Sequence, residues 1–333
     1  MTLPLPKVLV TGATGFVGGA LMSRLLNDDV ASPVAALRDK RTITTSIIET
    51  VPTAVIGAID GQTAWAAALS GVSTVVHVAA RVHVMSDTSA DPLAEFRRVN
   101  VDGTLNLAHQ AASAGVKRFV FVSSVKVNGE QTLSGQPFAE VDKAAPQDAY
   151  GQSKHEAEMG LRQLALDTGM DVVIIRPPLV YGPGVKANFA ALMRAVQRGW
   201  PLPLGAVHNQ RSLVALDNLV DLIVTCLDHP AAANQTFLVS DGQDLSTPEL
   251  VQGMAQAAGV PARLLSVPVW AMQAGASLLG KGAAVQRLCS NLQVDISKAR
   301  TLLGWVPPVS VAEGLRRAMG NDSGLPRSAR NDV

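Results

Sequence analysis

Residues 7–26 read KVLVTGATGFVGGALMSRLL, and this stretch decides the fold. The apolar run Lys7–Thr11 predicts a buried strand, and Phe16–Leu26 reads as the helix that follows it. Between the two, glycine stands at positions 12, 15 and 18. A glycine-rich turn that joins an apolar strand to a helix is typical of the first βα unit of a parallel α/β sheet.

Further strands alternate with helical stretches through the first half of the chain. Their nearly continuous Val, Ile and Phe content indicates helices on both faces of a parallel sheet. The predicted strands are Pro33–Leu37, Ala54–Ile56, Thr74–Val78, Arg118–Ser123 and Val172–Arg176, and the predicted helices cover about 92–114 and 150–167. The expected fold class is α/β, a Rossmann doubly wound parallel sheet with a smaller C-terminal substrate-binding lobe.

Composition limits the classes of protein that fit. The chain has 333 residues, of which 47% are apolar and 17% charged, as expected for a globular protein with two lobes. A net charge of +1 leaves no basic stripe for nucleic acid. Cys226 and Cys289 form neither a disulfide framework nor a metal cluster, so no metal site is expected. No signal peptide is evident, and the apolar segment 267–279 is too short to span a bilayer, which predicts a cytoplasmic protein.

The glycine loop predicts a dinucleotide site. Gly12 permits the tight turn, Gly15 lets the backbone approach a pyrophosphate, and Gly18 allows close packing of helix and strand. The phosphates would then meet N–H groups at the helix N-terminus. The expected contacts from this loop are Gly12, Thr14, Gly15, Phe16, Val17 and Gly18.

The end of the second strand bears on the choice between the two nicotinamide dinucleotides. An acidic residue about 20 positions after the glycine loop would bind the ribose of NAD. Here the strand ends with Leu37 and Arg38, and a guanidinium suits the 2′-phosphate of NADP. NADP(H) is therefore the expected cofactor, with NAD(H) as the alternative because Asp39 could neutralise Arg38. Ile59 and Asp60, after the third strand, are expected beside the adenine.

Tyr150 and Lys154 form the expected catalytic pair. They stand four residues apart, so both lie on one face of a helix. A nearby ammonium favours the phenolate and should lower the pKa of Tyr150. Ser123 and Ser124 end the strand before this helix, at the sheet edge where parallel sheets carry their chemistry. Two hydroxyls there could stabilise and protonate an oxygen that becomes negative during hydride transfer.

Together these motifs resemble the extended short-chain dehydrogenases/reductases of the sugar-nucleotide epimerase/dehydratase group. The resemblance runs from Val8 to about Met319. It implies that Tyr150 is the acid/base, that Lys154 also binds the nicotinamide ribose, and that Ser124 holds the reacting oxygen. Further cofactor contacts are implied at Ala79, Ala80, Arg81, Asn100 and Pro177.

The resemblance also implies a nucleotide-sugar in the second lobe and a homodimer. We expect the Rossmann domain at 1–176, the substrate lobe at 177–320 with some exchange of strands and helices, and a disordered tail at 321–333. Helices of the lobe are expected at 188–198, 216–227, 247–258, 269–279, 297–303 and 311–319. Expected substrate contacts are Arg81, Lys126, Val180, Asn188, Phe189, Leu204, Arg211 and Arg287, and Arg211 is the best candidate for gripping a diphosphate.

The predicted activity is reduction of the 4-keto group of a UDP-4-keto-6-deoxy-N-acetylhexosamine to a UDP-N-acetylquinovosamine type of product. Three segments, 80–85, 123–130 and 184–189, resemble bacterial 4-ketoreductases of surface-polysaccharide (O-antigen) synthesis, and Arg38 points to NADPH. The alternative is a UDP-glucose or UDP-N-acetylglucosamine 4-epimerase that holds NAD tightly. A 4,6-dehydratase fits less well, because Val125 and Lys126 replace the expected Asp-Glu pair. A non-catalytic NADP sensor also fits less well, because Ser124, Tyr150 and Lys154 are all present.

Overall fold

A seven-stranded parallel sheet forms the centre of the computed structural model, which describes residues 5–39, 46–82, 91–278 and 282–320. The strand order is β3-β2-β1-β4-β5-β6-β9. The strands are β1 Lys7–Thr11, β2 Ser32–Leu37, β3 Thr53–Val55, β4 Thr74–His77, β5 Arg118–Val122, β6 Asp171–Arg176 and β9 Thr236–Leu238. The order reverses between β1 and β4, which creates the crevice where open α/β sheets bind their ligands.

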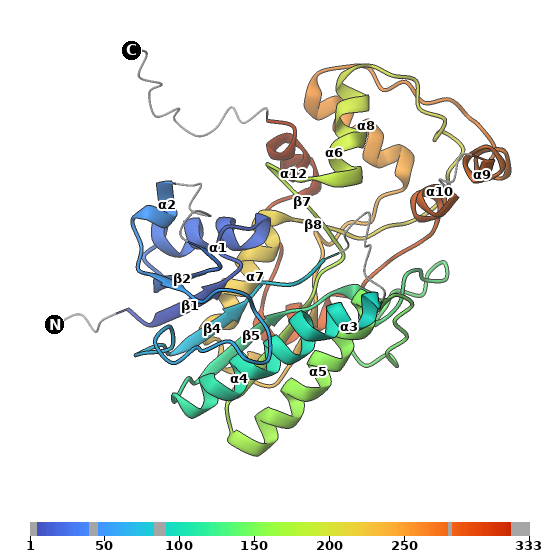
Figure 1. Cartoon of the computed structure of the whole chain (residues 1–333). Coiled ribbons are helices and arrows are strands. Elements are labelled where there is room, and N and C mark those ends of the chain that lie inside the picture. The colour runs from blue at the N-terminus through green and yellow to red at the C-terminus, as the bar shows by residue number, and fades with distance from the viewer. Residues whose placement is uncertain (1–4, 40–45, 83–90, 279–281, 321–333) are drawn as a thin grey trace, which may run out of the picture.

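Helices cover both faces of this sheet (Figure 1). One face carries α1 Phe16–Asn27 and α7 Leu216–Asp228, with α2 Ser46–Glu49 and α11 Ser297–Leu303 at its sides. The other carries α4 Gly103–Ser113 and α5 Ala149–Thr168, preceded by α3 Pro92–Arg97 and a π-helix, Arg98–Asp102. The predicted α/β Rossmann fold is confirmed.

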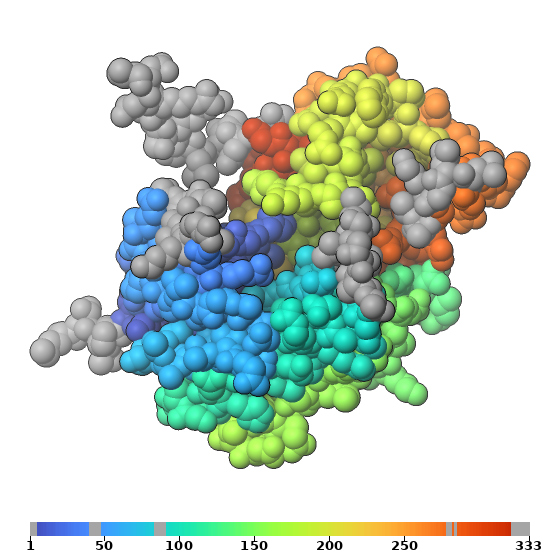
Figure 2. Space-filling view, viewed as in Figure 1, coloured from blue at the N-terminus to red at the C-terminus, as the bar shows by residue number. Residues whose placement is uncertain are grey.

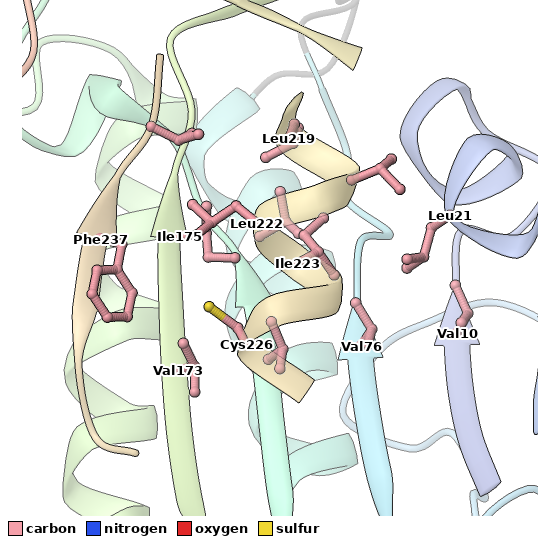
Figure 3. Packing of buried hydrophobic residues seen from close by; sticks show 14 of the residues in the cluster. Val10, Leu21, Val76, Val173, Ile175, Leu219, Leu222, Ile223, Cys226 and Phe237 are labelled. Carbon is pink, nitrogen blue, oxygen red and sulfur yellow. The ribbon is translucent and has the colours of Figure 1, made fainter. Parts of the chain in front are cut away.

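The strand period of two residues divides the core into two clusters. In β1, Val8 and Val10 pack toward α1 and α7, whereas Leu9 packs toward α4 and α5. Figure 3 shows α7 lying across the strands, with Leu222 and Cys226 among the aliphatic side chains of the sheet. Because both faces are buried, the strands need no polar positions, which explains their continuous apolar sequence.

The smaller lobe is built on a two-stranded parallel sheet, β7 Leu179–Tyr181 with β8 Leu213–Ala215. Its helices are α6 Ala187–Gln197, α8 Thr247–Ala258, α9 Val269–Leu278, α10 Gly282–Cys289 and α12 Val311–Ala318. Two single-turn 3₁₀ helices, Val125–Val127 and Pro230–Ala232, complete the described elements. A capping box at the start of α8 joins Ser246 to Glu249.

The structure departs from the expected elements in one helix and in three short strands. The single helix expected at 92–114 is broken by the π-helix, which begins before Asn100. Strand β9 joins the first sheet and helix α7 packs on it, although both come from the second half of the chain. Some exchange of this kind was expected, and the division at residue 176 stays a prediction. Strands β7, β8 and β9 are not among the expected strands. Each has three residues, too few to show a period of alternating side chains in the sequence. The expected tail at 321–333 lies outside the described residues.

No helix in the described ranges is long and apolar enough to cross a bilayer. The cytoplasmic location stays a prediction.

Candidate active site

The glycine loop has the geometry of a dinucleotide cradle. Gly12 takes a φ of +68°, and the N–H of Gly15 donates to the Gly12 carbonyl at 2.8 Å. A Cβ on Gly18 would lie 2.1 Å from that same carbonyl oxygen, so the loop tolerates no side chain there. No side chain caps the first turn of α1, which leaves the N–H groups around Phe16 and Val17 for an anion.

A pocket of about 550 Å³ opens beside this loop, at the switch point of the sheet. Seven of the residues expected to hold the cofactor line it: Gly12, Thr14, Arg38, Ile59, Ala79, Ala80 and Arg81. The remaining lining residues are Ala36, Ile56, Gly57, Ala58, Arg98 and Val99. Small side chains, a backbone cradle and an uncapped helix terminus fit a nicotinamide dinucleotide.

Thr11 and His77 organise the floor of the pocket, and the sequence does not predict this role. The N–H groups of Val78 and Ala79 donate to the Thr11 hydroxyl at 3.2 and 3.1 Å. Thr11 Oγ1 and His77 Nδ1 are 2.8 Å apart, and His77 Nε2 lies 3.0 Å from the Thr104 hydroxyl. Burial, with help from the Lys154 charge, lowers the pKa of His77 to about 3, so the ring is neutral and structural.

Arg38, Arg81 and Arg98 are the cations of the pocket lining, whereas Asp60 stands just outside it. The Asp60 carboxylate lies 3.6 Å from Arg98 and accepts hydrogen bonds from the backbone N–H of Gln62 and the hydroxyl of Thr63. Leu37, the last residue of β2, is buried, so it cannot bind a ribose. Arg38 remains the candidate contact for a 2′-phosphate.

Replacing Arg38 with alanine should weaken NADPH binding by about tenfold or more and NADH binding much less. The reason is that a charge-assisted hydrogen bond to a phosphate contributes about 1.5–3 kcal/mol. Titration of both reduced cofactors against the two proteins, followed by nicotinamide fluorescence, measures the difference. Equal losses for NADPH and NADH would reject the 2′-phosphate assignment, and Arg24→Ala on α1 is the matched control.

Ser124, Tyr150 and Lys154 converge at the carboxyl end of β5. Ser124 lies two residues past the end of β5 and caps the 3₁₀ turn, while Tyr150 stands in the first turn of α5 after the N-cap Asp148. The Ser124 hydroxyl is near enough to the Tyr150 phenol to lower the pKa of that phenol. The ring of Phe96 meets the Tyr150 ring edge-on at 6.1 Å, which holds the phenol in place.

The structure raises the pKa of Tyr150, contrary to the expected lowering. Burial of the phenol is the main cause, the negative charge of Asp148 adds to it, and the hydrogen bond from Ser124 opposes it. Lys154 does not offset these effects, because its Nζ donates to the Val122 carbonyl at 2.9 Å and lies 4.4 Å from the centre of the Phe121 ring. The nicotinamide of an oxidised dinucleotide is cationic and would favour the phenolate when bound.

Lys154 is buried, and burial lowers its pKa to about 7, with the charge of Glu158 opposing the shift. The folded protein thus releases this proton near pH 7, whereas the unfolded chain holds it up to about pH 10.5. Between these values the unfolded state binds more protons, so this group makes the free energy of unfolding rise with pH.

A Lys154→Met variant, studied without cofactor, should lack the increase in the free energy of unfolding with pH that Lys154 contributes. We expect the difference in free energy of unfolding, wild type minus variant, to increase from pH 7 to pH 10. Urea unfolding at several pH values measures it. Lys117→Met, at an exposed lysine, is the control and should show a constant difference. A constant difference for Lys154→Met as well would contradict the lowered pKa.

Asn100 acts in the structure as a buried clamp. Its Oδ1 accepts from the N–H of Arg81 at 2.8 Å, and its Nδ2 donates to the Arg81 carbonyl and the Ser153 hydroxyl, each at 3.0 Å. Ser153 in turn donates to the Tyr150 carbonyl. The amide therefore joins the pocket wall to the first turn of α5, and its predicted contact with the cofactor stays a prediction.

Beneath the catalytic residues lies a buried ion pair that sequence reasoning missed. Arg176 on β6 donates to Glu158 on α5 through Nε at 2.9 Å and Nη2 at 2.6 Å. Ser123 also donates to Glu158, at 2.6 Å, so this serine supports the site rather than faces it. Arg176 Nη1 donates to Asn128, and the N–H of Val125 donates to the carbonyl of Pro177, another expected cofactor contact. The sequence signal that could have drawn attention to Glu158 is its position four residues after Lys154, on the same face of the helix.

Two of the cations expected to bind substrate are engaged within the protein. Lys126 forms ion pairs with Asp148 and, at 3.4 Å, with Glu130. Arg211 Nη1 donates to the carbonyls of Arg287 and Ser290 at 2.6 and 3.0 Å, near the C-terminal end of α10. Burial lowers the pKa of Arg211. Their contacts with a substrate stay predictions.

The other expected substrate residues are spread over the second lobe. Phe189 is buried and stacks on Tyr181, with 5.5 Å between ring centres, and Leu204 is buried in the same core. Asn188 and Arg287 are exposed, Val180 is half-buried, and Arg81 lies over the Phe96 ring at 5.6 Å. Phe189 and Leu204 therefore shape the lobe from within.

The doubly wound sheet, the glycine cradle and the Ser124–Tyr150–Lys154 arrangement together define an enzyme of the short-chain dehydrogenase/reductase type. A model of the NAD dependent epimerase/dehydratase family matches residues 8–240. The chain belongs to this family, as the sequence resemblance implies.

Sugar 4-epimerases are among the relatives that cover nearly the full length of the chain. A UDP-glucose 4-epimerase of Vibrio cholerae is 51% identical over 316 residues, with 94% of each chain covered. An N-acetyl-α-D-glucosaminyl-diphospho-ditrans,octacis-undecaprenol 4-epimerase of Escherichia coli O157:H7 is 30% identical over 329 residues, again with 94% of each covered. The structure of MoeE5 in complex with UDP-glucose and NAD is similar with a TM-score of 0.74 and 25% identity, covering 94% of this chain and 97% of that one.

Proposed function

We propose that this enzyme is a UDP-sugar 4-epimerase that keeps NAD bound between turnovers. The similarity to the Vibrio cholerae UDP-glucose 4-epimerase, 51% identity over nearly the full length, carries the proposal. The intact Ser124, Tyr150 and Lys154 support it, as does the NAD in the similar MoeE5 structure. The findings thus favour the alternative of the sequence analysis over its first choice, the 4-ketoreductase.

Tyr150 moves the proton in this reaction. In the oxidation step its phenolate oxygen takes the hydroxyl proton at carbon 4, and in the reverse step it returns the proton to the carbonyl oxygen on the other face of the sugar. Bound NAD supplies the acceptor, and then the donor, of the hydride from carbon 4. Ser124 holds the reacting oxygen beside Tyr150. The positive charge of a bound oxidised nicotinamide would favour the phenolate, since the Lys154 Nζ is held by the Val122 carbonyl.

The second candidate is the NADPH-dependent 4-ketoreductase, and Arg38 is the observation that favours it. Arg38 lines the cofactor pocket, and none of the thirteen residues of that lining is acidic. A net reductase must exchange its cofactor at every turnover, whereas an epimerase regenerates it in place. The two functions therefore differ in what the purified enzyme carries.

The nucleotide released on denaturing the purified protein is the first test. Stoichiometric NAD, together with conversion of UDP-glucose to UDP-galactose without net change in cofactor, is the expected result. NADP or an empty protein, with NADPH consumed only in the presence of a UDP-4-keto-6-deoxy sugar, would establish the reductase instead.

We also propose a homodimer that pairs through α4 and α5. Met159 and Leu166 on α5 are exposed and stand seven residues apart, two turns along one face of the helix. Light scattering should give twice the chain mass of 34.8 kDa. A concentration-independent monomer would reject the dimer.

A further inference from the structure

One surface of the second lobe carries large apolar side chains in contact with solvent. Trp200 after α6, Leu265 before α9 and Trp270 in the first turn of α9 are 55%, 51% and 73% exposed. Together with Arg198 and Arg263 we call these residues the tryptophan face. Figure 2 shows the lobe that carries it, coloured yellow-green to orange, above the blue and cyan surface of the first lobe.

Backbone pairing brings the two segments of the tryptophan face side by side. The N–H of Leu202 donates to the Arg263 carbonyl, and the N–H of Leu265 donates to the Leu202 carbonyl, each at 2.8 Å. Leu202 and Leu264 pair and point into the lobe core. Side chains alternate along an extended chain, so Arg263 and Leu265 share the outer side. The Arg198 guanidinium lies 5.4 Å from the centre of the Trp200 ring.

Helix α9 continues this surface without any charged residue. Its sequence is VWAMQAGASL, and only Gln273 and Ser277 are polar apart from the backbone. Val269 and Met272 pack on the lobe core, whereas Trp270, Gln273, Ala274 and Gly275 face solvent. An exposed helix with so few polar side chains lowers the solubility of a protein unless a binding partner or a membrane covers it.

The two segments that supply the tryptophan face carry charges of one sign. Although the chain contains 27 Asp and Glu residues, none occurs in 182–216 or 250–294, the two segments that supply α6, most of α8, α9 and α10. These segments carry Lys186, Arg194, Arg198, Arg211, Arg263, Lys281 and Arg287. The nearly neutral chain therefore concentrates its acidic residues elsewhere, which leaves this part of the lobe locally cationic.

We propose that the tryptophan face docks the enzyme on an anionic phospholipid surface. Tryptophan rings settle at the boundary of headgroups and acyl chains, and arginines beside them pair with lipid phosphates. The helix lies on the bilayer and does not cross it. A second copy of the chain fits less well, because a two-fold contact would set arginine against arginine without any acidic partner.

Vesicle binding of the full-length protein tests the proposal. We expect sedimentation with vesicles of equal parts phosphatidylglycerol and phosphatidylcholine, little binding to phosphatidylcholine alone, and loss of binding on going from about 0.1 M to about 0.5 M salt. Arg198→Glu with Arg263→Glu should lower the partition coefficient by about tenfold or more. Trp200→Ala with Trp270→Ala should lower it by about tenfold.

Matched variants keep the test specific. Lys117→Glu makes the same kind of charge change at an exposed lysine of the first lobe, and Val141→Ser removes an exposed apolar side chain there. Both should bind vesicles as the wild type does, and every variant should keep its thermal unfolding midpoint and its turnover of soluble substrate. No binding to the anionic vesicles, equal binding by all variants, or a dimer that the tryptophan substitutions dissociate would each overturn the proposal.

Discussion

Replacing Tyr150 with phenylalanine should lower kcat by about 10²- to 10⁴-fold, the usual contribution of a general acid/base. The substitution removes one oxygen atom and keeps the ring against Phe96, so the fold of the site is preserved. Binding of the dinucleotide should change little, because Tyr150 is not among the residues that line the pocket of about 550 Å³ at the glycine loop.

Turnover and cofactor content, measured on the same preparation, separate the catalytic role of Tyr150 from a structural one. Phe96→Leu is the useful comparison, since it loosens the phenol but keeps its oxygen, and we expect a smaller loss of kcat. Activity of Tyr150→Phe within a few fold of wild type would contradict the acid/base assignment.

Glu158→Ala should destabilise the fold by about 3–5 kcal/mol, because removing one member of a buried pair leaves the other charge uncompensated. Glu158 is fully buried and Arg176 is only 3% exposed. Arg162 and Ser123 lose their partner in the same substitution. Urea unfolding measures the change in free energy, and the slope of the transition shows whether the unfolded state has changed as well.

Two variants sharpen this result. Glu156 lies two residues before Glu158 on the same helix and forms an exposed ion pair with Arg97. Glu156→Ala breaks this pair and should lower the free energy of unfolding much less than Glu158→Ala does. The double variant Glu158→Leu, Arg176→Met replaces both buried charges and should recover a large part of the loss. A cost for Glu158→Ala no larger than that for Glu156→Ala would show that the pair does not stabilise the fold.

The fold was predictable because its signals are local. The segment Lys7–Thr11, the glycines at 12, 15 and 18 and the Tyr150–Lys154 spacing each lie within one βα unit or one helical turn. Strand β9 gives no such signal, since a three-residue strand is recognised only by its pairing with β6. The π-helix around Asn100 was missed because its register depends on the contacts of the amide with Arg81 and Ser153.

The charged groups of the site were the least predictable feature. Spacing brings Lys154 near Tyr150, but the direction of its Nζ is set by the Val122 carbonyl, a backbone group on another element. Lys126 was expected to face substrate, yet its nearest acid is Asp148, 22 residues away in sequence. Such partners are chosen by tertiary packing, and a single sequence does not encode them as a pattern.

The late position of β9 in the chain has a consequence for synthesis of the protein. Strand β6 ends at Arg176, but its neighbour arrives only with Thr236–Leu238, after β7, α6, β8 and α7 have been made. Until then β6 is an open edge of hydrophobic residues, and the surface that α7 will cover is bare. A nascent chain is therefore exposed to edge-to-edge association during this interval, and a fragment that stops at residue 176 should aggregate rather than fold.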